Sequence, residues 1–136
     1  MAKALSLAYA RSSSYKAHLA QLKVFLIERL RNTFPAVYFH GDPTLEGSHP
    51  GILNFRLPPP YGHDLMLIHL DVHEIYASGT SACASGSGHP SHVLQALGLP
   101  PEEARKALRF SWGKETTQQD LDKAIEVLYS ATLQRT

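Results

Sequence analysis

A single cysteine in a run of small residues is the feature of this sequence best suited to chemistry. Cys83 is the only cysteine in the 136-residue chain, and residues 77–88 are all Ala, Ser, Gly, Thr or Cys. A buried structural thiol packs against bulky neighbours, and this run has none. Holding a glycine-rich segment in one conformation costs much entropy. The run is therefore predicted to be a mobile loop that carries a reactive group.

Sulfur transfer is one chemistry that such a loop could perform, because a thiolate can take a sulfur atom in one place and release it in another. A cysteine with the ordinary pKa of ~8.5 is only a few per cent ionised at neutral pH. His89, His92 and the start of a helix after Pro90 could lower that pKa. The alternative is an exposed linker cysteine without a function, and composition alone does not separate the two.

The eight histidines raise the question of a metal site. His69 and His73 lie four residues apart on a predicted helix, a spacing that can chelate a metal ion. His89 and His92 flank a Pro-Ser pair. No paired cysteines and no His-Glu-x-x-His pattern support either pair, so solvated histidines are the simpler interpretation and no metal site is predicted.

A long N-terminal helix and a small sheet must position these residues. Residues 2–33 contain no Gly or Pro, and Pro35 follows them. One face of this predicted helix carries apolar residues at helical spacing: Tyr15, Leu19, Leu22, Leu26 and Leu30. Strands are predicted at 37–40, 52–57, 75–78 and 108–112, and further helices at 63–73, at 90–97, as a short turn from 100, and after a capping box at 116–119.

The order of these elements predicts an α+β fold, or an α/β layer, in which helices cover a small sheet. The chain length fits one domain spanning 1–136. In the strand at 52–57, Leu53, Phe55 and Leu57 are expected to lie on one face. The helix at 63–73 is expected to present Leu65, Ile68, His69 and Val72 on one face.

Composition excludes several classes of function. Thirteen Lys and Arg against twelve Asp and Glu leave a formal charge of +1, which gives no electrostatic case for nucleic acid or an anionic membrane. One cysteine cannot form an internal disulfide, and no apolar run reaches the ~20 residues of a membrane span. Residues 8–10 have an A-x-A form, but the apolar stretch before them is too short for a signal peptide. A cytoplasmic protein is predicted.

The cysteine segment resembles a known active-site loop. Residues 78–87 (SGTSACASGS) and 90–94 (PSHVL) are similar to the cysteine loop of the pyridoxal-phosphate-dependent cysteine desulfurases, in the class with the longer loop. The resemblance runs from about 41 to 128. It is also carried by PGILNF at 50–55, LGL at 97–99, EEA at 102–104, LRFSWG at 108–113, TT at 116–117 and DLD at 120–122.

The resemblance implies an enzyme that removes sulfur from L-cysteine and leaves alanine, with the cofactor as electron sink. It implies that Cys83 is the nucleophile that becomes a persulfide. It implies that Arg109 binds the substrate carboxylate, for which a planar guanidinium is well shaped; a surface ion pair is the alternative role for Arg109. It also implies a small, mostly antiparallel sheet, like that of the small domain of fold-type I pyridoxal-phosphate enzymes.

The sequence lacks the family's cofactor-binding residues. No His-Lys pair occurs, and neither a phosphate-binding glycine loop nor a pyridinium-partner aspartate is evident. The chain therefore resembles the C-terminal small domain alone, with 1–33 as the connecting helix and 77–90 as the mobile cysteine loop. Pyridoxal phosphate is expected in the full enzyme, on a large domain absent here, so the isolated chain, a fragment or a split-gene product, is expected to be inactive.

The expected partners follow from the same resemblance. They are the large domain of the same enzyme, L-cysteine, and a sulfur acceptor such as an iron–sulfur scaffold, a tRNA-modifying enzyme or another carrier in thio-cofactor synthesis. The alternative is a stand-alone domain that receives sulfur on Cys83 from a donor and passes it on without a cofactor. A large domain encoded immediately upstream would separate the two.

Overall fold

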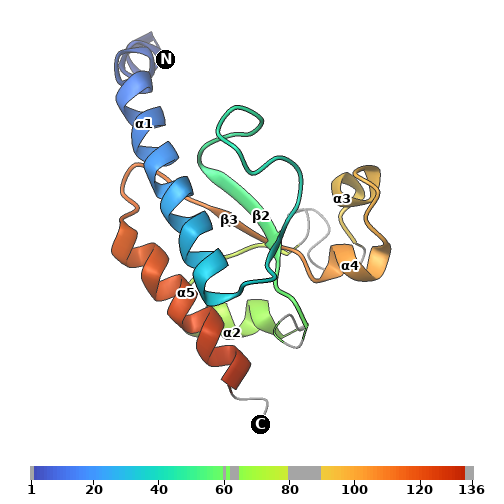
Figure 1. The fold of residues 1–136 in the computed structure, drawn as a ribbon. Coiled ribbons are helices and arrows are strands. Elements are labelled where there is room, and N and C mark those ends of the chain that lie inside the picture. The colour runs from blue at the N-terminus through green and yellow to red at the C-terminus, as the bar shows by residue number, and fades with distance from the viewer. Residues whose placement is uncertain (1, 60, 62–64, 80–89, 134–136) are drawn as a thin grey trace.

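A computed structural model describes residues 2–59, 61, 65–79 and 90–133 of the chain (Figure 1). The elements in chain order are α1 (Ala2–Thr33), β1 (Tyr38–Phe39), β2 (Ile52–Arg56), α2 (Met66–Val72), α3 (His92–Ala96), α4 (Pro101–Arg105), β3 (Leu108–Ser111) and α5 (Gln118–Leu133). Within this part of the chain, no helix is both long and apolar enough to cross a membrane.

The three strands form one antiparallel sheet in the order β1-β2-β3, so β2 is the central strand. Side chains alternate between the two faces of a strand. On β2, Leu53 and Phe55 are buried on the core face, and Leu57 follows them on the same side. Helices with a small antiparallel sheet confirm the predicted α+β fold class.

Helices α1 and α5 lie side by side over the core face of the sheet, with α2 packed against α5 (Figure 1). The leucines of α1 predicted to face the core, from Leu19 to Leu30, are buried, whereas Tyr15 is 40% exposed. Tyr15 lies in the N-terminal half of α1, whose first turns project beyond the rest of the molecule (Figure 1). The core is therefore built on the C-terminal half of this helix.

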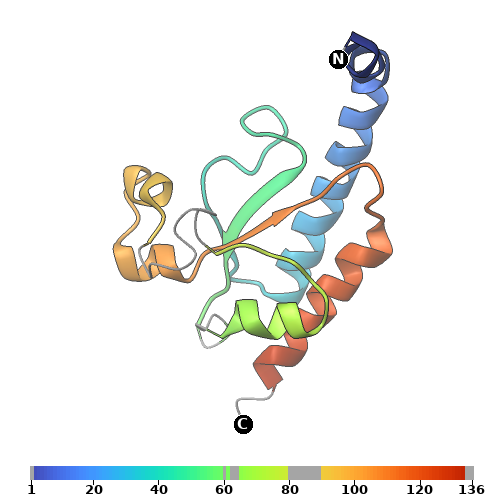
Figure 2. The same cartoon turned by 180° about the vertical axis from the view of Figure 1, so that it is seen from behind.

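Helices α3 and α4 lie on the other side of the sheet from α1 and α5 (Figure 2). They enclose a second, smaller apolar cluster of Leu94, Ala104 and Ala107. An ion pair between Arg56 and Glu103 joins α4 to β2. The outer face of the sheet is thus partly covered, and its polar side chains face the α3–α4 pair.

In the helix at 63–73, the face that carries the apolar spacing is not the one that packs against the core. Leu65, Ile68 and Val72 are exposed, while Met66 and Leu70 are buried against the core. Apolar residues occur on every side of this segment, so periodicity alone could not choose a face. Packing against α5 chooses it instead, and His69 lies within hydrogen-bond reach of Ser130 there.

Two further predictions need correction. The segment 75–78 is not a strand: only Ser78 pairs with Arg109, in an isolated bridge. The cap of α5 is one residue later than predicted, because the Thr117 hydroxyl accepts from the Asp120 amide (3.3 Å) and the Asp120 carboxylate accepts from the Thr117 amide (2.8 Å). The Thr116 hydroxyl instead accepts from the Gly113 amide at 3.1 Å.

Candidate functional site: the Arg109 pocket

Arg109 lies in the middle of β3, between buried Leu108 and Phe110, so its side chain faces away from the core. Asn54 on β2 is its direct cross-strand neighbour. A pocket of about 250 Å³ opens on this face of the sheet, and we call it the Arg109 pocket. It is lined by His40, Asn54, Gly79, Ser91, Val93, Leu94, Leu97 and Arg109.

Cys83 lies outside the described residues, but the residues on either side of its segment line the Arg109 pocket. Gly79 precedes the segment 80–89, and Ser91 follows it closely. A Cβ at Gly79 would come within 2.7 Å of Leu67 Cδ1 and 3.3 Å of the Ala107 carbonyl oxygen, so a side chain at this position would require Leu67 to shift. Ser91 is the N-cap of α3, and its hydroxyl accepts from the Leu94 amide at 3.5 Å.

His40 and Asn54 are site residues that sequence reasoning missed. His40 is 8% exposed, and its Nδ1 lies 2.6 Å from Asn54 Oδ1. An amide oxygen only accepts hydrogen bonds, so Nδ1 carries the proton and donates it. One signal was available: Asn54 lies between Leu53 and Phe55 in a strand, so it must face the outer side with Arg109.

The pKa of His40 is lowered, chiefly because burial disfavours the charged ring, and the hydrogen bond to Asn54 opposes this only in part. Nearby Arg56 also lowers the pKa, while Glu103 raises it. Among the described residues no group is hydrogen-bonded to the buried His40 Nε2. Because the pKa lies below the ordinary value of 6.5, His40 is neutral at pH 7.

We expect the stability of the fold to fall as the pH drops below about 6.5, the ordinary pKa of histidine. In the window between the lowered folded pKa and that value, the unfolded chain binds a proton that folded His40 does not, so acid favours unfolding. Urea denaturation between pH 7.5 and 5 measures the effect. His40→Asn should have a shallower pH dependence than the unaltered chain; equal slopes would contradict the expectation.

Lys23 is the other buried titratable side chain among the described residues. Its ammonium group donates to the Ser48 hydroxyl and to the His49 carbonyl oxygen (3.2 Å). Burial lowers the pKa of Lys23, and the negative charge of Asp42 opposes the shift. These contacts hold the loop before β2 against α1, away from the lining of the Arg109 pocket.

His69 on α2 and His73 at its C-cap contact each other. Their ring centroids lie 4.5 Å apart with the planes inclined by 38°, and His73 Nδ1 donates to the His69 carbonyl oxygen at 2.8 Å. Across the residues that the structure describes, no three His, Cys, Asp or Glu side chains are grouped so as to hold a metal ion.

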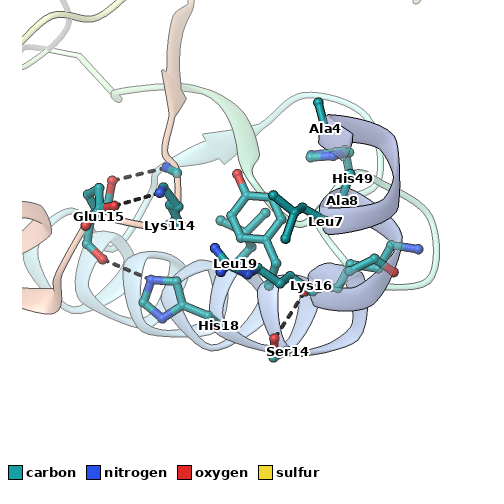
Figure 3. Close-up of a pocket in the computed structure, with 15 residues that line it drawn as sticks. Ala4, Leu7, Ala8, Ser14, Lys16, His18, Leu19, His49, Lys114 and Glu115 are labelled. Carbon is teal, nitrogen blue, oxygen red and sulfur yellow. Dashed lines mark hydrogen bonds and ion pairs between the residues drawn. The ribbon is translucent and has the colours of Figure 1, made fainter. Parts of the chain in front are cut away.

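A larger cavity of about 890 Å³ lies between the projecting half of α1 and the turn after β3 (Figure 3). Leu7 and Leu19 of α1 line it together with His49 and Lys114 (Figure 3). His18 Nε2 lies 3.1 Å from the Thr116 carbonyl oxygen at its edge. Arg109 does not line this cavity, so the Arg109 pocket is the candidate site.

The fold and the pocket define an α+β domain with an arginine on the open face of a small sheet, beside a segment that contains the only cysteine. No family model matches the chain. It is 36% identical over 135 residues to cysteine desulfurase IscS of Clostridium botulinum, covering 99% of this chain and 34% of that protein. It is 38% identical over 112 residues to cysteine desulfurase IscS of Pseudoalteromonas translucida, covering 82% of this chain and 26% of that protein.

A solved structure titled as a NifS-like protein superposes with a TM-score of 0.73 and 25% identity, covering 95% of this chain and 31% of that one. The chain is therefore a homologue of cysteine desulfurases over about one third of their length, which confirms the resemblance found in the sequence. Because it spans so little of these relatives, the activity of a whole desulfurase comes to this chain only as a proposal.

Proposed function

We propose that this chain is the small domain of a cysteine desulfurase and contributes Cys83 and Arg109 to an active site completed by a large domain. The observation that supports this best is the position of Gly79 and Ser91, which border the cysteine segment in sequence and line the Arg109 pocket. Cys83 follows Gly79 by four residues, so chain length alone keeps the two Cα atoms within ~14 Å.

The proposed reaction converts the Cys83 thiol and L-cysteine into a Cys83 persulfide and L-alanine. Cys83 attacks as the thiolate, since the thiol itself is a weak nucleophile. Arg109 binds the substrate carboxylate, for which a guanidinium offers two parallel N–H donors. The persulfide sulfur then passes to an acceptor, an iron–sulfur scaffold or another carrier, in the cytoplasm.

The described residues do not fit pyridoxal phosphate as a cofactor of this chain alone. A Schiff base needs a lysine amine, and no lysine lines the Arg109 pocket. The buried amine of Lys23 already donates to Ser48 and His49. The proposal therefore assigns the cofactor to the large domain and expects the purified chain to be colourless with pyridoxal phosphate and inactive on L-cysteine.

Arg109→Gln in an enzyme reconstituted with a large domain is expected to lower kcat/KM for L-cysteine at least tenfold. A hydrogen bond to a charged group contributes about 1.5–3 kcal/mol, and 1.4 kcal/mol corresponds to a factor of ten. Lys106→Gln, an exposed charge change after α4, serves as the matched control. An unchanged KM and kcat for Arg109→Gln, with Lys106→Gln also unchanged, would remove Arg109 from the substrate site.

A further inference from the structure

We propose that Asn54 is a second carboxylate-binding residue beside Arg109, and that His40 is the positioning residue that turns the Asn54 amide group toward the ligand. This inference rests on the proposed function, because it extends the role given there to Arg109. It assigns a ligand contact to Asn54 on the central strand. It also explains why His40 is buried next to Asn54.

The sheet register places Asn54 and Arg109 together. They are direct partners on β2 and β3, and both face the outer side of the sheet. Side chains at directly opposed positions of an antiparallel pair have Cβ atoms ~4.5–5.5 Å apart. Both residues line the same pocket, so one small ligand can contact both.

The amide group of Asn54 has a defined orientation. Its Oδ1 accepts from His40 Nδ1 at 2.6 Å, which leaves the Nδ2 hydrogens on the other side of the group. The contact with His40 is made by Oδ1 and not by Nδ2. In this orientation the pocket presents two amide hydrogens next to a guanidinium. The reversed orientation would present an oxygen atom and would repel a carboxylate.

His40 is well held for this task. Its backbone amide donates to the Asn54 carbonyl oxygen at 3.0 Å, and its ring lies against the Tyr38 ring with centroids 5.3 Å apart. The imidazole is 8% exposed, and Arg56 lies over the same Tyr38 ring, with its Cζ 5.4 Å from the ring centroid. Its Nδ1 carries a proton in the neutral form that donates to Asn54 and also in the cationic form, so the amide orientation persists when His40 is protonated.

The Arg109 pocket is small. About 250 Å³ is the volume of only several water molecules at ~30 Å³ each, and it is below the range of ~300–1,000 Å³ for drug-sized ligands. Carboxylate recognition is the chemistry that an arginine and an amide donor share. An α-amino acid such as L-cysteine, and a simple carboxylate such as propionate, both carry that group.

Binding to the chain itself tests the inference without turnover. Sodium propionate and L-alanine are titrated while NMR follows the Asn54 Nδ2 and Arg109 Nε hydrogens; sodium chloride and n-propylammonium chloride are the controls. We expect both carboxylates to shift both side-chain signals saturably, while the two controls do not. Loss of one amide donor in Asn54→Ala is expected to weaken carboxylate binding about tenfold.

The His40 variants test whether His40 orients the Asn54 amide group or only stabilises the fold. His40→Leu removes the donor and is expected to weaken binding at least threefold. His40→Asn keeps an N–H donor at the same distance from Cβ and should restore most of the affinity. Ser111→Ala, on the same face of β3 but outside the pocket lining, should bind as the unaltered chain does. Ring ¹⁵N spectra of the unaltered chain should show His40 protonated at Nδ1.

Each outcome decides the question. A proton on Nε2 of neutral His40, or full carboxylate affinity in either Asn54→Ala or His40→Leu, overturns the inference. If Arg109→Gln abolishes binding in that case, the role of Arg109 in the proposed function survives. If carboxylates do not bind saturably, or bind equally well to Arg109→Gln, both the inference and the proposed role of Arg109 fail.

Discussion

Replacing Cys83 with serine is expected to abolish the formation of a sulfur adduct on this chain. A polysulfide donor transfers one neutral sulfur atom to a thiolate, which becomes a persulfide while the donor is shortened by one sulfur. Because Cys83 is the only cysteine, no other thiol can accept that atom. Intact-mass spectrometry should detect one added sulfur on the unaltered chain, a reductant should remove it, and Cys83→Ser should gain none.

Two controls accompany this experiment. Ser85→Ala changes the same segment without removing the thiol and should form the adduct normally. Alkylation under native conditions should modify Cys83 fully, and thermal melts of Cys83→Ser should match those of the unaltered chain. An adduct that persists in Cys83→Ser, a thiol that resists alkylation in the folded protein, or a strongly lowered Tm would each contradict the role proposed for Cys83.

Phe55→Ala is expected to lower the free energy of unfolding by about 3–5 kcal/mol, the usual range for deleting a buried aromatic side chain. Phe55 is fully buried on the central strand. Its ring meets Phe110 of β3 edge to face, with centroids 5.2 Å apart. The variant therefore loses apolar burial and a ring contact between two strands at once, and leaves a cavity in the core.

Ile52→Ala is the matched control for Phe55→Ala. Ile52 begins the same strand but is 42% exposed, so its truncation should lower the free energy of unfolding by less than about 1 kcal/mol. Urea denaturation with unchanged m-values would measure both differences. Equal losses in the two variants would show that the packing around Phe55 contributes no more than an exposed strand residue does.

The sequence by itself was sufficient to predict buried faces and the family wherever one local pattern dominated. Leucines at helical spacing in residues 19–30 indicated the buried face of α1, and the alternation of Leu53, Phe55 and Leu57 indicated the core face of β2. The resemblance around Cys83 indicated the family to which the relatives belong. For the helix and the strand, only one orientation buries the periodic apolar residues. For the cysteine segment, the motif is specific to one family.

Where the sequence allowed several interpretations, only the tertiary structure determined which side chains are buried and which segments form strands. Met66 and Leu70 face the core in α2 because α5 packs there, although apolar residues surround the helix. The segment 75–78 contributes one bridge to Arg109 and no strand. Such outcomes depend on partners far away in the sequence, which a local window does not contain.

For the Arg109 pocket, too, the sequence predicted some features and the tertiary structure determined the others. The resemblance could single out Arg109, and strand alternation could place Asn54 and Arg109 on outer faces. Neither pattern could show that the two residues would be opposite each other, because the register depends on how two strands separated by 51 residues are paired. Nor could either pattern bring His40 to Asn54, since that 2.6 Å contact requires β1 to pair with β2 and the ring to be buried. Local chemistry could thus be predicted from residue type, whereas the contacts that orient it arise only when distant segments pack together.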